Sequence, residues 1–328
     1  MQTYILQRFL LTIPTVVFVT VLTFLFLRVF LPANVIDQIL GEYARTDPEL
    51  RARLERELGL SSGLPNQYAE WLGVAWFWGG PEGIVQGNLG ESLWTQRTVV
   101  SVLAERVPIT LELALLSIGF SMIYGGITGV ISAVYQDRPM DLSLRSIAMA
   151  FLSLPTFWLG TLAIVLPSLW LGWSPSIRLV PFSEDQLGNL IQFALPAVIL
   201  GTHLGAPVMR MSRAMLLEAF RQDYVRTAWA KGLEARRVIY KHALRNAVIP
   251  TVNILGVQVS QAIAGSVVLE TLFGLPGMGS LLIEAVAHRD FPMFQSLVLC
   301  LGLFVIVINL LVDLACAVID PRLRVRHG

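Results

Sequence analysis

The sequence has 328 residues, of which 55% are hydrophobic and only 14% are charged, and its formal net charge is +1. Soluble domains carry about 25% charged residues and about 45–50% apolar ones, so this composition excludes an ordinary soluble domain. The mean hydropathy is +0.65, and no half of the chain is polar, which favours several membrane spans over a single anchor. Cys300 and Cys316 lie about 24 Å apart on one expected helix, which is too far for a disulfide.

The first apolar segment, residues 9–31, follows Arg8 and is closed by Pro32. Its length suffices to span about 30 Å of hydrocarbon. A cleaved signal peptide is the alternative, but the segment exceeds the typical core of about 7–15 residues and no convincing cleavage site follows it. Five further spans are predicted at residues 108–134, 146–171, 193–213, 248–270 and 293–319. The predicted fold class is therefore an all-α integral membrane protein with six transmembrane helices.

Basic residues are concentrated in alternate connecting segments, which predicts the orientation of the chain. Segments 135–145, 214–247 and 320–328 are rich in Arg or Lys, whereas segments 172–192 and 271–292 hold one arginine each. We therefore expect both termini in the cytoplasm. The segment after the first span, 32–107, is too long to count in this comparison and is expected outside.

The predicted external loop contains a helix that begins at Asp47, where Leu50, Leu54 and Leu58 recur at helical spacing. An aromatic cluster follows, and an interfacial belt is favoured over a ligand cage as its role. Its members are Tyr68, Trp71, Trp76, Phe77, Trp78 and Trp94. Residues 59–63 formally match the G-x-S-x-G motif of hydrolases, but the sheet that this motif requires cannot be built here.

Small residues in the second predicted span permit close helix packing. They are Ser117, Ser121, Gly125, Gly126 and Gly129. Pro155, Pro167, Pro196 and Pro207 are expected to break or kink later spans.

Five ionisable residues lie within or beside the spans. Arg28, Glu112 and Glu270 are near span ends, where side chains can snorkel or face water. His203 and Asp313 are candidates for the translocation pathway, with a packed, hydrogen-bonded structural role as the alternative for each.

The segment ETLFGLPGMG, residues 270–279, contains tight-turn residues and precedes a short amphipathic helix with Leu281, Leu282, Ala285 and Val286. This helix is expected either to lie in the membrane interface or to fold over the mouth of a pathway as an external gate. The gate candidates are Glu270, Phe273, Pro276, Gly277 and Gly279.

The segment from Arg221 to Pro250 is the longest polar, basic interruption in the C-terminal two thirds of the chain, and it holds both lysines of the chain, Lys231 and Lys241. We predict two short helices, one over residues 224–231 capped by Asp223 and one over residues 234–246, with a turn at Gly232. A basic helix resting on anionic lipid is the alternative to a protein-docking surface. The small side chains of Thr227, Ala228 and Ala230 favour docking.

This segment resembles the EAA loop of binding-protein-dependent ABC importer permeases, whose pattern is E-A-A-x3-G-x9-I-x-L-P. Ala228, Gly232 and Leu244 fall in register, whereas Arg226, Thr227, His242 and Arg245 depart from the pattern. These departures resemble the oligopeptide/dipeptide permease branch, where DYVRTAxAKGL and HALRNAxIP are typical. Seven further segments resemble that branch, although Asn88 stands where Asp is usual: YILQRFLLTIP at 4–14, QYAEWL at 67–72, GNLGESL at 87–93, TLELAL at 110–115, SLPTFWLG at 153–160, ETLFGLPGMG at 270–279 and NLLVDLACAVIDPR at 309–322.

The resemblance implies a type I ABC importer permease that transports peptides, with four parts along the chain. They are an N-terminal helix (1–31), an external loop domain (32–107), a five-helix core (108–319) that includes the coupling loop 214–247, and a cytoplasmic tail (320–328). The expected ATPase-coupling residues are Asp223, Tyr224, Arg226, Thr227, Ala228, Ala230, Lys231, Gly232, Leu233, Arg236 and Arg237.

The implied partners are a second homologous permease, two ATPase subunits, an external substrate-binding protein and membrane lipid. The implied location is the bacterial or archaeal inner membrane. ATP and Mg²⁺ would be bound by the ATPase subunits, and we expect this chain to hold no cofactor and no nucleic acid.

Independent features of the sequence argue against an enzyme. Both lysines lack the preceding glycine of a phosphate-binding loop, and the four histidines form no H-E-x-x-H metal site. An ion-coupled secondary transporter remains an alternative, although neither inverted repeats nor paired midplane charges are evident. A membrane receptor or anchor is a further alternative, and relatives of the branch that carry nickel or oligosaccharides leave the substrate open.

Overall fold

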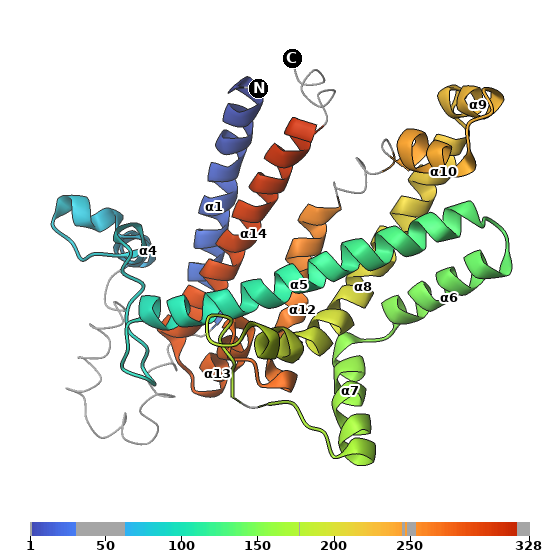
Figure 1. Cartoon of the computed structure of the whole chain (residues 1–328). Helices are drawn as coiled ribbons and strands as arrows, with labels where there is room; N and C mark the ends of the chain where they lie inside the picture. Colours follow the sequence, from blue (N-terminus) through green and yellow to red (C-terminus); the bar gives the residue numbers. More distant parts are fainter. Residues whose placement is uncertain (1, 31–62, 177, 245–246, 248–253, 320–328) are drawn as a thin grey trace. The chain divides into compact units, whose positions relative to one another are not determined.

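The computed structural model describes residues 2–30, 63–176, 178–244, 247 and 254–319. The described chain is helical, with one isolated β-bridge between Glu91 and Thr98 (Figure 1). Five helices are long and apolar enough to cross a membrane, and a sharply bent helix pair brings the number to six if the pair counts as one span. The structure therefore confirms the predicted fold class in the described residues.

The elements follow one another in this order along the chain. They are α1 (Gln2–Phe30), α4 (Leu64–Leu72), the 3-10 helices η2 (Val74–Trp78) and η3 (Ile84–Gln86), α5 (Val99–Val134), α6 (Pro139–Ser153), α7 (Thr156–Leu171), α8 (Gln186–Phe220), α9 (Asp223–Ala230), α10 (Ala235–Arg237), the π-helix η4 (Val238–Ala243), α12 (Leu255–Phe273), α13 (Met278–Ala287) and α14 (Phe291–Ile319). The helix predicted to begin at Asp47 and residues 59–62 of the G-x-S-x-G match lie outside the described residues.

Two of the helices are much longer than the predicted spans. α5 begins at Val99 rather than at residue 108, and α8 covers residues 186–220 rather than 193–213. The prediction from apolar character missed the added turns because they carry polar and charged side chains, such as Glu105 and Arg106 in α5 and Glu218 in α8. The backbone hydrogen bonds of both helices continue through these added turns, although the side chains are not continuously apolar.

The chain divides into two compact units, each of which is described separately. The first unit comprises residues 1–9, 108–280 and 307–328, and the second comprises residues 10–107 and 281–306.

In the first unit, α5 and α8 pack closely because small residues face each other. A Cβ atom on Gly125 would lie 2.5 Å from the carbonyl oxygen of Gly205, and one on Gly201 would lie 2.7 Å from that of Ser117. Gly129 makes a similar approach to Met209. Lipid tails are as apolar as a helix surface, so the hydrophobic effect does not drive helices together within a membrane. Small residues that let two backbones approach closely are therefore a common basis of helix packing there. The predicted role of Gly126 is wrong, because a Cβ there would meet no described atom within 4 Å.

The third predicted span is a bent pair rather than one helix. α6 and α7 meet at an angle of 96° across Leu154 and Pro155. Proline lacks an N–H donor and disfavours the helical conformation of the residue before it, and Leu154 accordingly has extended torsion angles. α6 then packs along α8, whereas α7 contacts both α8 and α12. The kink predicted at Pro155 is confirmed.

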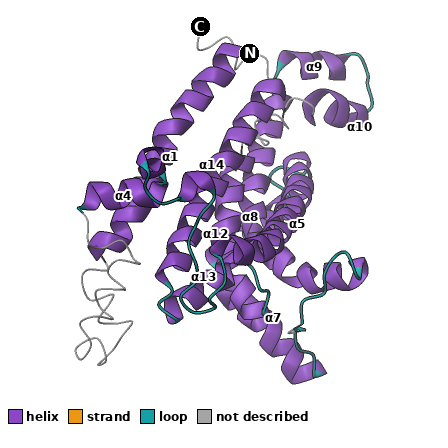
Figure 2. Cartoon of the chain, turned by 90° about the vertical axis from the view of Figure 1, so that its left-hand side faces the viewer, coloured by secondary structure: helices purple, strands orange, loops and turns teal. Residues whose placement is uncertain are grey.

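In the second unit, α4 packs against the later turns of α1. The ring of Phe24 lies 5.3 Å from that of Tyr68 and 5.7 Å from that of Trp71, and the hydroxyls of Thr20 and Tyr68 are hydrogen-bonded at 2.8 Å. Two members of the predicted aromatic cluster are thus packing residues. The side chains of Trp76, Phe77, Trp78 and Trp94 are exposed. α14 lies beside α1, with Gly302 against Val19 (Figures 1 and 2).

The neighbouring glycines of α5 offer a matched test of this packing. Gly125→Ala places a methyl group against Gly205 and Val208 and should destabilise the protein by about 1–3 kcal/mol through overpacking. Gly126→Ala should leave stability unchanged. Thermal unfolding of the two purified variants in detergent measures the difference, and equal melting temperatures would contradict the observed α5–α8 contact.

Candidate coupling surface and candidate gate

The first candidate site is the polar segment after α8, where α9 and η4 pack against each other (Figure 2). α9 begins at Asp223 with Gln222 as the N-cap residue. The prediction that Asp223 caps the helix is therefore wrong. Asp223 instead lies in the first turn, where a carboxylate interacts favourably with the helix dipole.

The predicted turn at Gly232 is confirmed. The N–H of Gly232 donates to the carbonyl of Trp229 at 2.9 Å, and the N–H of Leu233 donates to that of Ala228 at 3.4 Å. This double pattern is a Schellman motif, which needs a left-handed residue after the C-cap. Gly232 has a φ of 72°, which glycine adopts without strain.

One face of α9 packs inward on a cluster formed by four helical elements, which we call the hinge cluster. It consists of Ala133 from α5, Leu216 and Ala219 from α8, Val225 and Ala228 from α9, and Val238, Ala243 and Ala247 from the following segment. Ala228 is therefore a buried packing residue, and its predicted place on a docking surface is wrong. Leu233 also packs against this cluster and is only partly accessible. Position 228 requires a residue as small as alanine, because the hinge cluster packs against it.

The opposite face of α9 is exposed, and we call it the candidate coupling surface. It is formed by Asp223, Tyr224, Arg226, Thr227, Ala230, Lys231 and Gly232. Trp229 at its edge is 45% exposed, although tryptophan usually buries its large ring. Trp229 was not among the coupling residues predicted from the sequence, although a tryptophan in an otherwise polar, basic helix was a usable signal.

The segment after the turn is helical, as predicted, but has an unusual hydrogen-bonding pattern. α10 covers only Ala235–Arg237 and continues as the π-helix η4. The exposed side chains of Arg236, Arg237 and Tyr240 line an open depression of about 370 Å³, together with Glu234 and Lys241. Tyr240 is 57% exposed and was also not singled out from the sequence. Single-turn π segments are frequent at functional sites.

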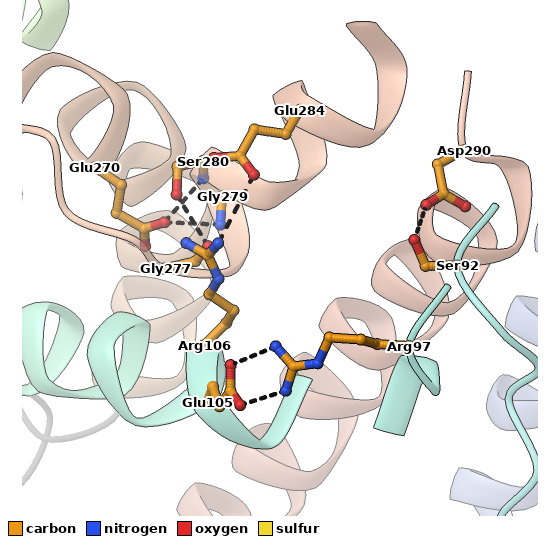
Figure 3. A network of polar contacts seen from close by, with 10 residues as sticks. All are labelled: Ser92, Arg97, Glu105, Arg106, Glu270, Gly277, Gly279, Ser280, Glu284 and Asp290. Carbon is orange, nitrogen blue, oxygen red and sulfur yellow. Dashed lines mark hydrogen bonds and ion pairs between the residues drawn. The ribbon is translucent and has the colours of Figure 1, made fainter. Parts of the chain in front are cut away.

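The second candidate site is the turn between α12 and α13, where the structure brings the five predicted gate residues together. Glu270 is fully buried, so the prediction that it snorkels or faces water is wrong. Its carboxylate accepts a hydrogen bond from the Thr110 hydroxyl at 2.8 Å. It also accepts from the N–H groups of Gly279 at 2.7 Å and Ser280 at 3.1 Å (Figure 3). Thr110 in turn accepts from the N–H of Met278 at 2.8 Å. The carboxylate thereby satisfies unpaired N–H groups at the start of α13.

Two gate candidates are glycines because α12 lies so close. A Cβ on Gly277 would collide with the carboxylate of Glu270, and one on Gly279 would collide with the backbone of Val267 and lie 2.9 Å from that carboxylate. Phe273 is buried in the apolar core with Leu269 and Leu275, and Pro276 is partly buried in the turn. The five residues therefore form a closed, hydrogen-bonded turn within the first unit.

A comparable carboxylate in the second unit was missed by the sequence analysis. Asp290, between α13 and α14, accepts a hydrogen bond from the hydroxyl of Ser92 (Figure 3). It also accepts from the N–H groups of Leu93 and Met293. The ring of His288 stacks on that of Trp94 at 3.9 Å. The sequence feature that could have indicated this site is Asp290 itself. It directly precedes α14, whose second residue is a proline, and aspartate is a typical N-cap residue.

The two pathway candidates have different outcomes. His203 on α8 is partly buried, and its Nδ1 lies 3.3 Å from the carbonyl oxygen of Phe151 on α6. This contact fits the packed, structural alternative. The side chain of Asp313 lies outside the described ones. Glu112 is partly buried, and the side chain of Arg28 also lies outside the described ones.

Comparisons with known proteins cover nearly the whole chain. Residues 125–325 match the family described as "Binding-protein-dependent transport system inner membrane component", and residues 1–114 match the N-terminal family of the same membrane components. The "Di/tripeptide transport system permease protein DppB" of Pseudomonas aeruginosa (strain UCBPP-PA14) is 37% identical over 99% of both chains. A "putative peptide transport system permease protein" of Brucella abortus (strain 2308) is 39% identical over 99% of both chains.

The solved structures add agreement in fold. A chain of the MetNI methionine ABC transporter, in inward-facing conformations, superposes with a TM-score of 0.54 at 20% identity, covering 68% of this chain and 98% of that one.

Substitution of Glu270 tests the role of its carboxylate. Glu270→Leu leaves the Thr110 hydroxyl and two buried N–H groups without their acceptor, each at a cost of about 1–3 kcal/mol. Glu270→Gln should retain most of the stability, because its amide can donate to Thr110 while its oxygen accepts from both N–H groups. Thermal unfolding and hydrogen exchange of residues 278–280 measure the effect. Equal losses in the two variants would show that the charge matters rather than the acceptor geometry.

Proposed function

Because the chain belongs to the family of binding-protein-dependent transport system inner membrane components, we propose that it is the membrane-spanning permease subunit of an ATP-driven peptide importer. The observation that carries this proposal is the candidate coupling surface. An exposed helical face with basic and aromatic side chains packs through its other side on a buried apolar cluster.

The peptide substrate is supported by the relatives that match over their full length, since they are described as di/tripeptide or putative peptide permeases. We propose short peptides as the cargo on this ground. Nickel or an oligosaccharide is the alternative within the same family, and selectivity would then reside in the external binding protein that delivers the substrate.

The proposed mechanism follows from the exposed side chains of α9 and from its packing on the hinge cluster. Tyr, Trp and Arg are the residues that dominate protein interfaces, and Tyr224, Arg226 and Trp229 offer them on one short helix. We propose that an ATPase subunit, with ATP and Mg²⁺, docks there, and that a second permease with its own ATPase completes the pathway. The two ATPases would close on ATP binding and move α9 together with the hinge cluster on which it packs. Linkage requires that ATP binding favours the outward-open state.

The proposed orientation follows the distribution of basic residues. The candidate coupling surface and both termini face the cytoplasm, and the turn between α12 and α13 faces outward in a bacterial or archaeal inner membrane. In this orientation, the turn held by Glu270 lies on the side from which a binding protein delivers substrate, as an external gate requires.

The function is tested by reconstituting the whole complex in proteoliposomes with the binding protein. We expect uptake of labelled dialanine that requires ATP and persists when the proton gradient is dissipated. Uptake that follows a proton gradient without ATP would overturn the importer proposal in favour of a secondary transporter. ATP-dependent uptake of nickel in place of dialanine would overturn only the assigned substrate.

Two exposed tryptophans provide a matched test of the docking surface. Trp229→Ala should weaken association with the ATPase subunits by at least about 2 kcal/mol, or about 30-fold, as expected for the loss of an interface anchor. Trp78→Ala removes a tryptophan that is 80% exposed in the second unit and should leave association unchanged. Co-purification at graded ATPase concentrations measures both. An unchanged affinity in Trp229→Ala would contradict the assigned surface.

A further inference from the structure

An ion pair with a buried carboxylate joins α8, which leads to the candidate coupling surface, to α6, the first helix of the bent pair. The guanidinium of Arg213 on α8 donates to both carboxylate oxygens of Asp141 on α6, from Nε at 3.0 Å and from a terminal nitrogen at 2.7 Å. Asp141 is fully buried and also accepts from the hydroxyl of Ser132 on α5 and from the N–H of Asp137 at 3.0 Å. One carboxylate therefore joins α5, α6 and α8.

The pair stands next to the hinge cluster. Ser132 directly precedes Ala133, and Arg213 lies one helical turn before Leu216. Ala133 and Leu216 belong to the hinge cluster, on which α9 packs. A displacement of α9 therefore acts on the ends of α5 and α8, where Asp141 holds the beginning of α6.

α6 is attached to α8 along its whole length. The ion pair holds its first turn, Ala148 packs with Ala206 and Met209 in the middle, and the carbonyl of Phe151 meets His203 near the end. Helices joined at three levels move as one body. The chain then bends by 96° at Pro155, and that bend is the place where rotation between α6 and α7 can occur.

Beyond the bend, α7 reaches the candidate gate. A Cβ on Gly160 of α7 would lie 3.0 Å from Leu269 and 3.7 Å from Phe273, and these two residues flank Glu270 on α12. All of these contacts lie within the first unit. A continuous series of packed elements therefore connects α9 with the turn that Glu270 holds.

An ion pair on a fully buried carboxylate is rarely more stabilising than apolar residues of similar volume, because the carboxylate loses its hydration and the partly buried guanidinium loses part of its own. Its value lies in the geometry that it imposes, since a bidentate arginine–carboxylate contact permits one orientation. Stability alone therefore does not account for this pair.

We propose that Arg213 and Asp141 are positioning residues that transmit the movement of α9 to α6, so that α6 and α8 swing as one body and α7 moves the turn held by Glu270. This inference rests on the proposed ATP-driven function. It assigns the transmission of movement to the contact between Arg213 and Asp141, which lies outside both the candidate coupling surface and the candidate gate.

The test measures the ATP-driven movement of α7 in the assembled complex. Spin labels are placed at Leu169→Cys on α7 and Val257→Cys on α12, which are exposed, in a chain with Cys300→Ala and Cys316→Ala. We expect the distance between the labels to change on addition of ATP. Asp141→Asn or Arg213→Gln should reduce this change about fivefold or more, while the ATPase subunits still co-purify and hydrolyse ATP.

Two variants of α8 serve as controls. Arg213→Lys keeps the charge but loses the bidentate contact, and should give an intermediate change. Arg210→Gln removes an exposed arginine one turn away and should behave as the natural chain does. A full ATP-driven change in Asp141→Asn and Arg213→Gln would overturn the inference. A natural chain that binds no ATPase and shows no change would overturn the proposed function itself.

A cross-link between α6 and α8 tests the single-body movement even if the variants fold poorly. Ala148→Cys and Ala206→Cys place two thiols in one buried cluster. Oxidation of this pair should leave ATP-driven movement of α7 intact, because α6 and α8 do not separate. Loss of the movement on oxidation, restored by reduction, would show that the two helices slide past each other and would overturn the inference.

Discussion

The arrangement of the first unit depends on one constraint, which is that a polar group enclosed between packed helices is cut off from water. Leaving such a group without a hydrogen bond costs free energy, so most buried polar side chains pair within the protein. Glu270 meets Thr110 and two backbone N–H groups, and Asp141 meets Arg213 and Ser132. Gln258 on α12 bridges the hydroxyl of Ser121 on α5 and the carbonyl of Leu204 on α8. These contacts select which helices touch and in which register, a choice that apolar packing alone leaves broad.

Close helix packing makes these polar contacts possible. Glycine brings α5 and α8 into close contact, and short side chains of α5 bridge to other helices, Ser121 to Gln258 on α12 and Ser132 to Asp141 on α6. The same closeness leaves no room for a Cβ on Gly125 or Gly201. Small residues and buried polar residues thus work together: the small ones determine the distance between helices, and the polar ones determine their relative position along the axes.

The candidate coupling surface follows a different rule, because water can satisfy its polar groups. Its charged side chains need no partner within the chain, and its shape comes from the Schellman turn at Gly232 and from the apolar face that packs on the hinge cluster. In the proposed function, the rigid packing behind the surface allows a small helix to transmit force. A docking helix without such packing would absorb a movement in its own flexibility.

Apolar length, Pro155, Gly232 and the alternation of helix and turn in residues 270–292 were sufficient to predict the all-helical membrane fold, the bend, the turn after α9 and α13 from the sequence alone. These features depend on local chemistry: the missing N–H of proline, the left-handed conformation open to glycine, and the length needed to cross hydrocarbon. The tertiary structure alone decided that Ala228 points inward, that Glu270 is buried, that Gly126 has no described neighbour and that Asp141 meets Arg213. The last of these contacts joins residues 72 positions apart. Which face of a helix meets a distant partner depends on the packing of all the helices together, and no local pattern contains that information.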